Sequence, residues 1–264
     1  MKTQDFWDKS CMGKDKTNEM PHLWGNIIYF VLYPLGKLLW RIKVKNIDRL
    51  RAFKGKSGVL LISNHTSYIE TYLMYCCVRL KQWCRFMARS TLFDHKLLGW
   101  FLSRAGVFPI KRDSADTTSL KRAAKMLKNK EIVGIFPEGT RRGKSNKEPY
   151  LHSGAAFIAR LGGNVPILPM TCRNADKIKT KGHFIRFPKI TVEFGNPIFL
   201  SDFNFIEKER RYEAITWYSM RECFALFYQI SPEKVDMKSL FPKTYDYSEF
   251  FLKHPIKRHS VNEI

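Results

Sequence analysis

The chain has 264 residues, 44% of them hydrophobic and 27% charged, with 46 Lys and Arg against 24 Asp and Glu. This composition excludes a disordered, collagen-like or coiled-coil protein, and the length suits one α/β domain with short appendages. A net charge of +22 predicts an anionic partner: nucleic acid, an acidic membrane surface or a phosphorylated substrate. Six cysteines without metal-type spacing, and no cleavable signal, predict reduced thiols in the cytoplasm and no metal site.

The N-terminal part divides into a polar and an apolar segment. Residues 1–20 lack apolar periodicity and predict a loose tail. Leu23 to Trp40 is rich in aromatic and branched residues and is followed by basic ones, but its longest run free of strongly polar residues, Ile27 to Gly36, is shorter than the roughly 20 that span a bilayer. We expect a helix lying in one leaflet of an anionic membrane; a buried helix and a spanning helix are the alternatives.

Apolar runs and amphipathic stretches alternate after residue 56. The expected strands are Ser57–Ser63, Arg85–Ala88, Val107–Ile110, Glu131–Phe136, Val165–Thr171 and the β-rich segment Phe184–Phe194. The expected helices are Tyr68–Leu80, Phe93–Ser103, Ala115–Asn129, Ser153–Leu161 and Ile206–Gln229. This alternation predicts an α/β fold with a mixed, largely parallel sheet covered by helices. We divide the chain into an N-terminal tail with a membrane-associated helical segment (1–56), the α/β domain (57–235) and a poorly packed C-terminal tail (236–264).

The first candidate site is the segment Asn64-His65-Thr66-Ser67-Tyr68-Ile69-Glu70, between the first strong strand and a helix. In open α/β sheets, sites collect at such strand ends. A carboxylate that accepts a hydrogen bond from one imidazole nitrogen orients the ring, so that the other nitrogen can take a proton from a hydroxyl. The spacing of His65 and Glu70 fits this role, and it fits a satisfied histidine near a helix cap as well.

The second candidate site is the turn Phe136-Pro137-Glu138-Gly139-Thr140-Arg141-Arg142-Gly143, also after a strand. It presents backbone N–H groups, a carboxylate and two guanidinium groups, and a planar guanidinium can bind two phosphate oxygens. It is not a nucleotide-binding loop, because three residues rather than four separate its glycines. A solvated basic turn is the alternative.

Two further segments carry weaker signals. Lys111 and Arg112 follow a strand and can contact phosphate or belong to plain surface. The apolar run Val165 to Met170 contains two prolines, which predicts an edge strand or a pocket wall. The sequence lacks the motifs of serine hydrolases, dinucleotide-binding proteins and zinc proteases, and it lacks nucleic-acid-binding signatures. We therefore expect no nucleic-acid partner.

These four blocks, in this order over residues 64–170, resemble the glycerolipid acyltransferase family, of the lysophosphatidic acid acyltransferase type. The block FPEGTR is highly specific, and an upstream Asn-His with an acid five residues after the histidine strengthens it. The resemblance implies that His65 is the general base and that Glu70 orients it, where the family usually has Asp. The extra methylene of Glu would move the carboxylate by about one bond length.

The resemblance also implies the substrate contacts. It assigns phosphate binding to Arg112 and Arg141, with Lys111 as a weaker contact, and the shape of the turn to Glu138, Gly139 and Thr140. It associates the fourth block with the acyl-donor or acyl-chain side of the site. It further implies an N-terminal membrane-associated helical motif, which matches Leu23 to Trp40.

The implied reaction is direct acyl transfer from acyl-CoA or acyl carrier protein to the free hydroxyl of lysophosphatidic acid, giving phosphatidic acid without an acyl-enzyme. The thioester is a co-substrate, and no cofactor is expected. The implied partners are the two substrates, an anionic membrane surface and acyl carrier protein, at the cytoplasmic face of a membrane. Another lysophospholipid or glycerol-3-phosphate as acceptor, and a non-catalytic lipid-binding relative, are the alternatives.

Overall fold

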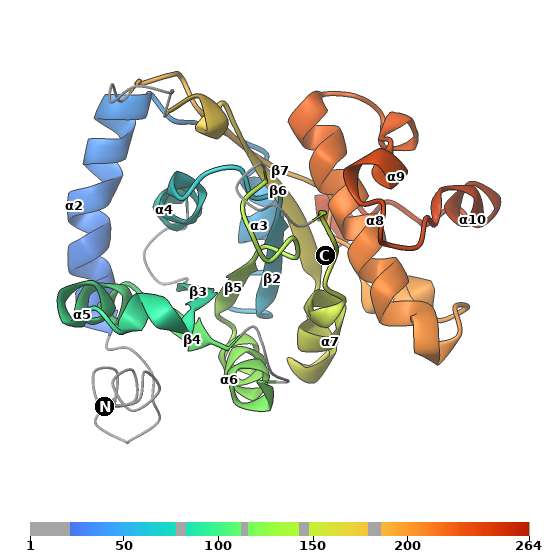
Figure 1. The fold of residues 1–264 in the computed structure, drawn as a ribbon, viewed down its shortest axis with the longest axis horizontal. Helices are drawn as coiled ribbons and strands as arrows, with labels where there is room; N and C mark the ends of the chain where they lie inside the picture. The colour runs from blue at the N-terminus through green and yellow to red at the C-terminus, as the bar shows by residue number, and fades with distance from the viewer. Residues whose placement is uncertain (1–21, 78–82, 112–115, 143–147, 179–185, 264) are drawn as a thin grey trace.

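The computed structural model describes residues 22–77, 83–111, 116–142, 148–178 and 186–263, which form an α/β fold (Figure 1). Its strands are β1 (Lys43–Lys45), β2 (Val59–Ser63), β3 (Cys84–Arg89), β4 (Val107–Ile110), β5 (Ile132–Ile135), β6 (Ile167–Arg173) and β7 (Thr191–Phe194). Its α-helices are α2 (His22–Trp40), α3 (Asp48–Arg51), α4 (Ile69–Cys77), α5 (Lys96–Arg104), α6 (Thr117–Lys128), α7 (Gly154–Leu161), α8 (Lys208–Tyr228), α9 (Met237–Leu240) and α10 (Ser248–Lys253).

The described strands form one seven-stranded sheet in the order β1-β7-β6-β2-β5-β3-β4. The β6–β7 pair is antiparallel, and the other described neighbours are parallel. β2 lies at the centre, with Leu61 opposite Gly134 on one side and Leu168 on the other. All five residues of β2 are buried, which explains why its sequence is a continuous apolar run. The predicted mixed, largely parallel sheet is confirmed.

Helices cover both faces of this sheet (Figure 1). On one face, α8 packs against β2 and β6, α6 packs against β4 and β5, and α7 contacts both helices. On the other face, α4 contacts β3 and β7, and α2 packs on the outer side of α4. Because β2, β5, β3 and β4 are parallel, their carboxyl ends meet at one edge of the sheet, where sites are expected.

Helix α2 is attached to the body through α4. The Tyr72 hydroxyl donates a hydrogen bond to the Leu32 carbonyl, and a side chain at Gly36 would collide with that hydroxyl. The Trp40 ring packs edge-on against Tyr72, with the centroids 5.8 Å apart. Among the helices of the described ranges, none combines the length and the apolar character needed to cross a bilayer. The loose tail predicted over residues 1–20 lies outside the described residues.

Two expectations about the elements need correction, and one strand was not expected. The segment Val165 to Met170 predicts an edge strand or a pocket wall, and the edge-strand alternative is wrong because β6 is internal, between β2 and β7. Its Pro169 is tolerated there because the ladder to β7 begins one residue later, at Met170. The edges of the described sheet are β4 and β1. β1 has three residues, pairs with β7, and gave no strand signal because two of the three are lysines.

The expectation of a poorly packed C-terminal tail is wrong. Met237, Phe241, Tyr247 and Phe251 are buried in the main core, where Phe251 stacks on Trp217 of α8 with centroids 5.7 Å apart. Met237 and Phe241 stand four residues apart, as do Tyr247 and Phe251, because each pair lies on or directly beside a short helix, α9 or α10. Residues 236–251 therefore form a cap on α8.

Candidate active site

The turn that carries His65 begins where β2 ends. Asn64 is fully buried, and its side-chain carbonyl accepts a hydrogen bond from the Thr171 hydroxyl of β6 at 2.9 Å. This contact ties the end of β2 to the neighbouring strand. His65 follows it, with 13% of its side chain exposed, and its ring stacks on Phe136 with centroids 4.1 Å apart. The contacts of Asn64 and Phe136 thus fix the position of the imidazole where β2 and β5 end.

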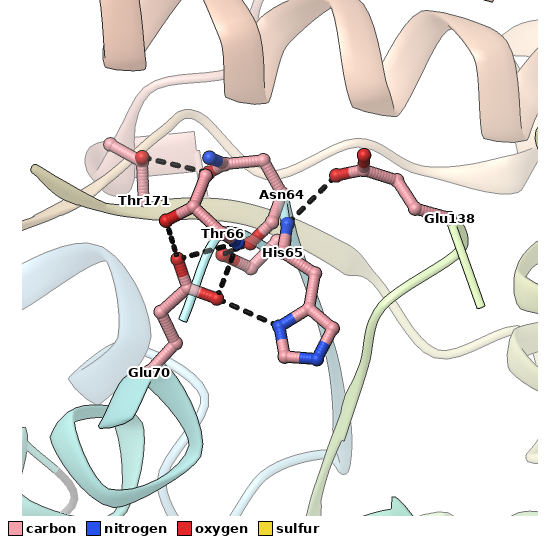
Figure 2. Close-up of polar contacts among 7 residues, drawn as sticks. Asn64, His65, Thr66, Glu70, Glu138 and Thr171 are labelled. Carbon is pink, nitrogen blue, oxygen red and sulfur yellow. Dashed lines mark hydrogen bonds and ion pairs between the residues drawn. The ribbon is translucent and has the colours of Figure 1, made fainter. Parts of the chain in front are cut away.

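Glu70 orients this imidazole (Figure 2). Its carboxylate lies in the first turn of α4, has 1% of its surface exposed, and accepts a hydrogen bond from His65 Nδ1 at 2.8 Å. It also accepts from the Thr66 backbone N–H at 2.9 and 3.0 Å and from the Thr66 hydroxyl at 2.5 Å. The positive end of a helix dipole favours a carboxylate at this position. The longer Glu side chain therefore reaches the imidazole, and the predicted His65–Glu70 pair is formed.

Glu138 links the second block to the first. Its Oε1 accepts a hydrogen bond from the His65 backbone N–H at 2.7 Å, and its Oε2 pairs with the Arg142 guanidinium at 3.0 Å (Figure 2 shows the first contact). The Arg142 backbone N–H in turn donates to the His65 carbonyl at 2.8 Å. Burial raises the pKa of the Glu138 carboxyl, and Arg142 and the His65 amide partly offset this. The backbone of His65 is thus held from both sides by the EGTR turn.

Arg142 connects this turn to the C-terminal cap. Its guanidinium lies 4.9 Å from the ring centroids of both Phe224 and Phe241, and its Nη1 donates to the Leu240 carbonyl at 3.4 Å. A quarter of the side chain is exposed. Arg142 is therefore a structural cation between Glu138 and the aromatic cap, rather than a group open to a ligand.

Replacing Arg142 with alanine is expected to lower the free energy of unfolding by roughly 2–4 kcal/mol, because it leaves the buried Glu138 carboxylate unpaired. Urea denaturation of the purified variant measures this. The matched control is Arg141→Ala at the next position, which should change the stability by less than about 0.5 kcal/mol. Equal stability of the two variants would contradict the assigned role.

The neighbouring Arg141 points to a different environment. Its guanidinium stacks over the exposed ring of Tyr68 at 3.4 Å, so the two predicted blocks also touch at the surface. Gly139 has a φ of 64°, a left-handed conformation, and a side chain there would approach His152 Nε2 at 3.0 Å. Thr140 is exposed, and its backbone N–H donates to the Glu138 carbonyl at 2.7 Å, which closes the turn. Arg141 therefore contacts the segment that carries His65 through Tyr68.

The third block lies farther away. Lys111 follows β4, which is three strands from β2, so its backbone is on the order of 14 Å from the end of β2. Its side chain is exposed, and its backbone N–H donates to Asp116 at 3.0 Å. Arg112 lies outside the described residues. The described part of this block therefore shares the sheet edge with His65 without contacting it.

Four residues of the site were not predicted as site residues from the sequence. Thr66 and Phe136 hold the carboxylate and the ring, and Asn64 and Arg142 hold the backbone. Thr66 and Asn64 are adjacent to His65, so their positions were the available signal. No local signal indicated the role of Arg142, because this role depends on Leu240 and Phe241, about a hundred residues later in the chain.

The geometry defines one chemical capability. The buried Glu70 carboxylate accepts from Nδ1 of His65, so the neutral ring that makes this hydrogen bond has its lone pair on Nε2. An imidazole fixed in this way can remove a proton from a hydroxyl. Arg141, stacked on Tyr68 of the same segment, supplies a cation that suits a phosphate group.

Comparison with known proteins agrees with this chemistry. The acyltransferase family profile matches residues 41–173, about half of the chain. The 1-acyl-sn-glycerol-3-phosphate acyltransferase of Bacillus subtilis (strain 168) is 30% identical over 175 residues, which cover 66% of this chain and 82% of that protein. A Streptococcus pneumoniae protein of the same name is 29% identical over 170 residues, which cover 62% of this chain and 60% of that protein.

A solved structure has the same fold. The crystal structure of the 1-acyl-sn-glycerophosphate (LPA) acyltransferase PlsC from Thermotoga maritima aligns with a TM-score of 0.55 at 18% identity, over 84% of this chain and 87% of that one. At this identity the likeness concerns the fold alone. It places the α/β sheet and its helices in a known architecture.

Proposed function

Because this chain belongs to the acyltransferase family, we propose that it transfers a fatty acyl group from a thioester donor to the free hydroxyl of lysophosphatidic acid, giving phosphatidic acid. The observation that carries the proposal is the buried Glu70 carboxylate on Nδ1 of His65. The names of the Bacillus and Streptococcus relatives support the choice of acceptor.

In the proposed mechanism, Nε2 of His65 takes the proton of the acceptor hydroxyl as the oxygen attacks the thioester carbonyl. The thiol leaves with a proton, and no acyl-enzyme forms. Arg141 binds the acceptor phosphate and so orients the acceptor on the enzyme. Holding the reactants in this way lowers the activation free energy by several kcal/mol. Arg112 of the third block is proposed as a second phosphate contact, and Lys111 as a weaker one. The thioester already carries the activated acyl group, so the reaction needs no cofactor.

The donor and the location are part of the same proposal. Both acyl-CoA and acyl carrier protein present a thioester, and the net charge of +22 favours either of these anionic donors. We propose that α2 lies on the cytoplasmic face of an anionic membrane, since both lipids of the reaction reside there. The exposed Leu23, Phe30, Val31 and Leu38 side chains of α2 support this position.

The direct test is the release of free thiol from a long-chain acyl-CoA by purified protein in anionic vesicles, with and without lysophosphatidic acid. Release that depends on the acceptor, with phosphatidic acid as the product, is the expected result. The same assay with acyl carrier protein as donor, and with glycerol-3-phosphate or another lysophospholipid as acceptor, separates the substrates. If no pair of donor and acceptor gives acceptor-dependent release, the proposed activity is refuted, and the non-catalytic lipid-binding relative is the remaining alternative.

Arg141→Ala is expected to raise the KM for lysophosphatidic acid by about 10- to 100-fold with a smaller change in kcat, because a charge-assisted contact to the phosphate is lost. Arg141→Lys should retain only part of the affinity for lysophosphatidic acid, since lysine lacks the planar guanidinium that binds two phosphate oxygens. Lys111→Ala, at the exposed end of β4, is the matched control with a smaller effect. A loss of kcat at unchanged KM in Arg141→Ala would contradict phosphate binding.

A further inference from the structure

Helix α5 turns most of its large apolar side chains outward and its two smallest residues inward. Gly99 and Ser103 are buried against the body, whereas Leu97, Trp100 and Phe101 are exposed. The exposed fraction of Leu97 is 87%, the highest of the large apolar side chains in the described ranges. A surface helix of a globular protein usually shows the reverse arrangement. An apolar face of this density indicates an interaction surface.

This face is continuous with the exposed face of α2. The rings of Trp24 and Trp100 meet edge to face, with centroids 5.8 Å apart. The Arg104 guanidinium stacks on both rings, 5.2 Å from the centroid of Trp24 and 4.1 Å from that of Trp100. Figure 1 shows α2 and α5 at the same end of the molecule, away from α8 and α10. We call the exposed apolar side chains of the two helices the α2–α5 surface; they are Leu23, Ile27, Phe30, Val31, Leu35, Leu38, Leu97, Leu98, Trp100 and Phe101.

The charges around the α2–α5 surface have one predominant sign. Residues 22–45 contain no Asp or Glu, and Lys37, Arg41, Lys43 and Lys45 lie within them. Residues 89–104 contain three basic residues and one acid, Asp94. An apolar face with basic flanks and Trp side chains between them matches the acyl chains, the anionic headgroups and the interface of a lipid leaflet.

We propose that α5 is a second membrane-contact element, which enters the surface of an anionic bilayer together with α2. A single interfacial helix leaves the protein free to rotate about the helix axis, whereas a second contact beside it fixes the orientation of the sheet and its site edge. The inference rests on the proposed function, because lipid substrates require a defined approach of the site to the leaflet. Binding itself is measured without catalysis.

The test is flotation of the full chain with vesicles of phosphatidylcholine and phosphatidylglycerol. Leu97→Glu is expected to lower the vesicle partition coefficient about tenfold or more, since it replaces an apolar side chain that would lie in the lipid with a negative charge. The matched control is Leu252→Glu on α10, which is also highly exposed, at 66%, and lies at the opposite end of the molecule (Figure 1). It should bind like the unchanged protein. Both positions are exposed, so both variants are expected to fold.

Quenching by lipids with brominated acyl chains gives a second readout. The quenched fraction of tryptophan emission should fall in Trp100→Phe relative to the unchanged chain, because Trp100 is expected at interface depth. Flotation of Leu97→Glu at the unchanged level, or equal quenching with and without Trp100, would overturn the proposal. A lipid-independent dimer that Leu97→Glu dissociates would assign the surface to a second copy and overturn it too. Vesicle binding through α5 without acyl transfer would refute the proposed function alone.

Discussion

Replacing His65 with alanine is expected to lower the rate of acyl transfer by about 10²- to 10⁴-fold, the usual contribution of a positioned general base. The fold should survive the change. The two backbone contacts of His65, from its N–H to Glu138 and from its carbonyl to the Arg142 N–H, do not involve the ring. Glu70 keeps its hydrogen bonds from Thr66. We expect a loss of stability of about 1 kcal/mol from the Nδ1 hydrogen bond.

The measurement is kcat for thiol release from acyl-CoA in vesicles, together with urea denaturation of the same preparation. His152→Ala is the matched control, because His152 lies beside the turn at Gly139 and belongs to no proposed step. The control should keep at least half of the activity, within the scatter of a surface substitution. Turnover in His65→Ala like that of the unchanged protein would contradict the mechanism. Turnover lost together with folding would show that the ring is structural.

The elements that the sequence could predict are those whose signal is local. The strands β2 and β4 were predicted correctly, because their apolar residues are buried in one continuous sheet. His65 and Glu70 were predictable for the same reason, since five residues across a strand-to-helix turn bring them within hydrogen-bond distance. The Glu-Gly-Thr-Arg turn was visible through its glycine, which adopts a positive φ.

The features that depend on distant contacts could not be predicted. Arg141 and Arg142 are identical residue types side by side, yet one stacks on Tyr68 at the surface and the other lies between Phe224 and Phe241. Nothing in the local sequence distinguishes them, because the cap that surrounds Arg142 comes from the end of the chain. The cap itself was missed although its buried residues stand four apart in two pairs, because α9 and α10 are each shorter than the roughly 11 residues over which a helical period is recognised.

Glu70→Gln is expected to reduce kcat by about 10²-fold or more with little change in the KM values. Glutamine has the size of glutamate, but it offers one acceptor oxygen to three donors: His65 Nδ1, the Thr66 N–H and the Thr66 hydroxyl. If the amide NH₂ faces Nδ1, the ring must carry its proton on Nε2 and can no longer act as a base. If the oxygen faces Nδ1, it also keeps the hydrogen bond from the Thr66 N–H, but the NH₂ then takes the Oε1 position, where it faces that N–H at 3.0 Å and the Thr66 hydroxyl must turn to accept from it. Either arrangement also costs about 1–3 kcal/mol of stability.

Glu70→Asp separates the charge of this residue from its length. It keeps the carboxylate and withdraws it by about one bond length, about 1.5 Å, from a nitrogen that now lies at 2.8 Å. The activity should therefore fall between those of Glu70→Gln and the unchanged protein, unless the turn at Thr66 moves to follow the shorter side chain. Steady-state kinetics of both variants, with urea denaturation for each, distinguish these cases. Full activity in Glu70→Gln would contradict the orienting role, because that variant removes the charge and preserves the shape.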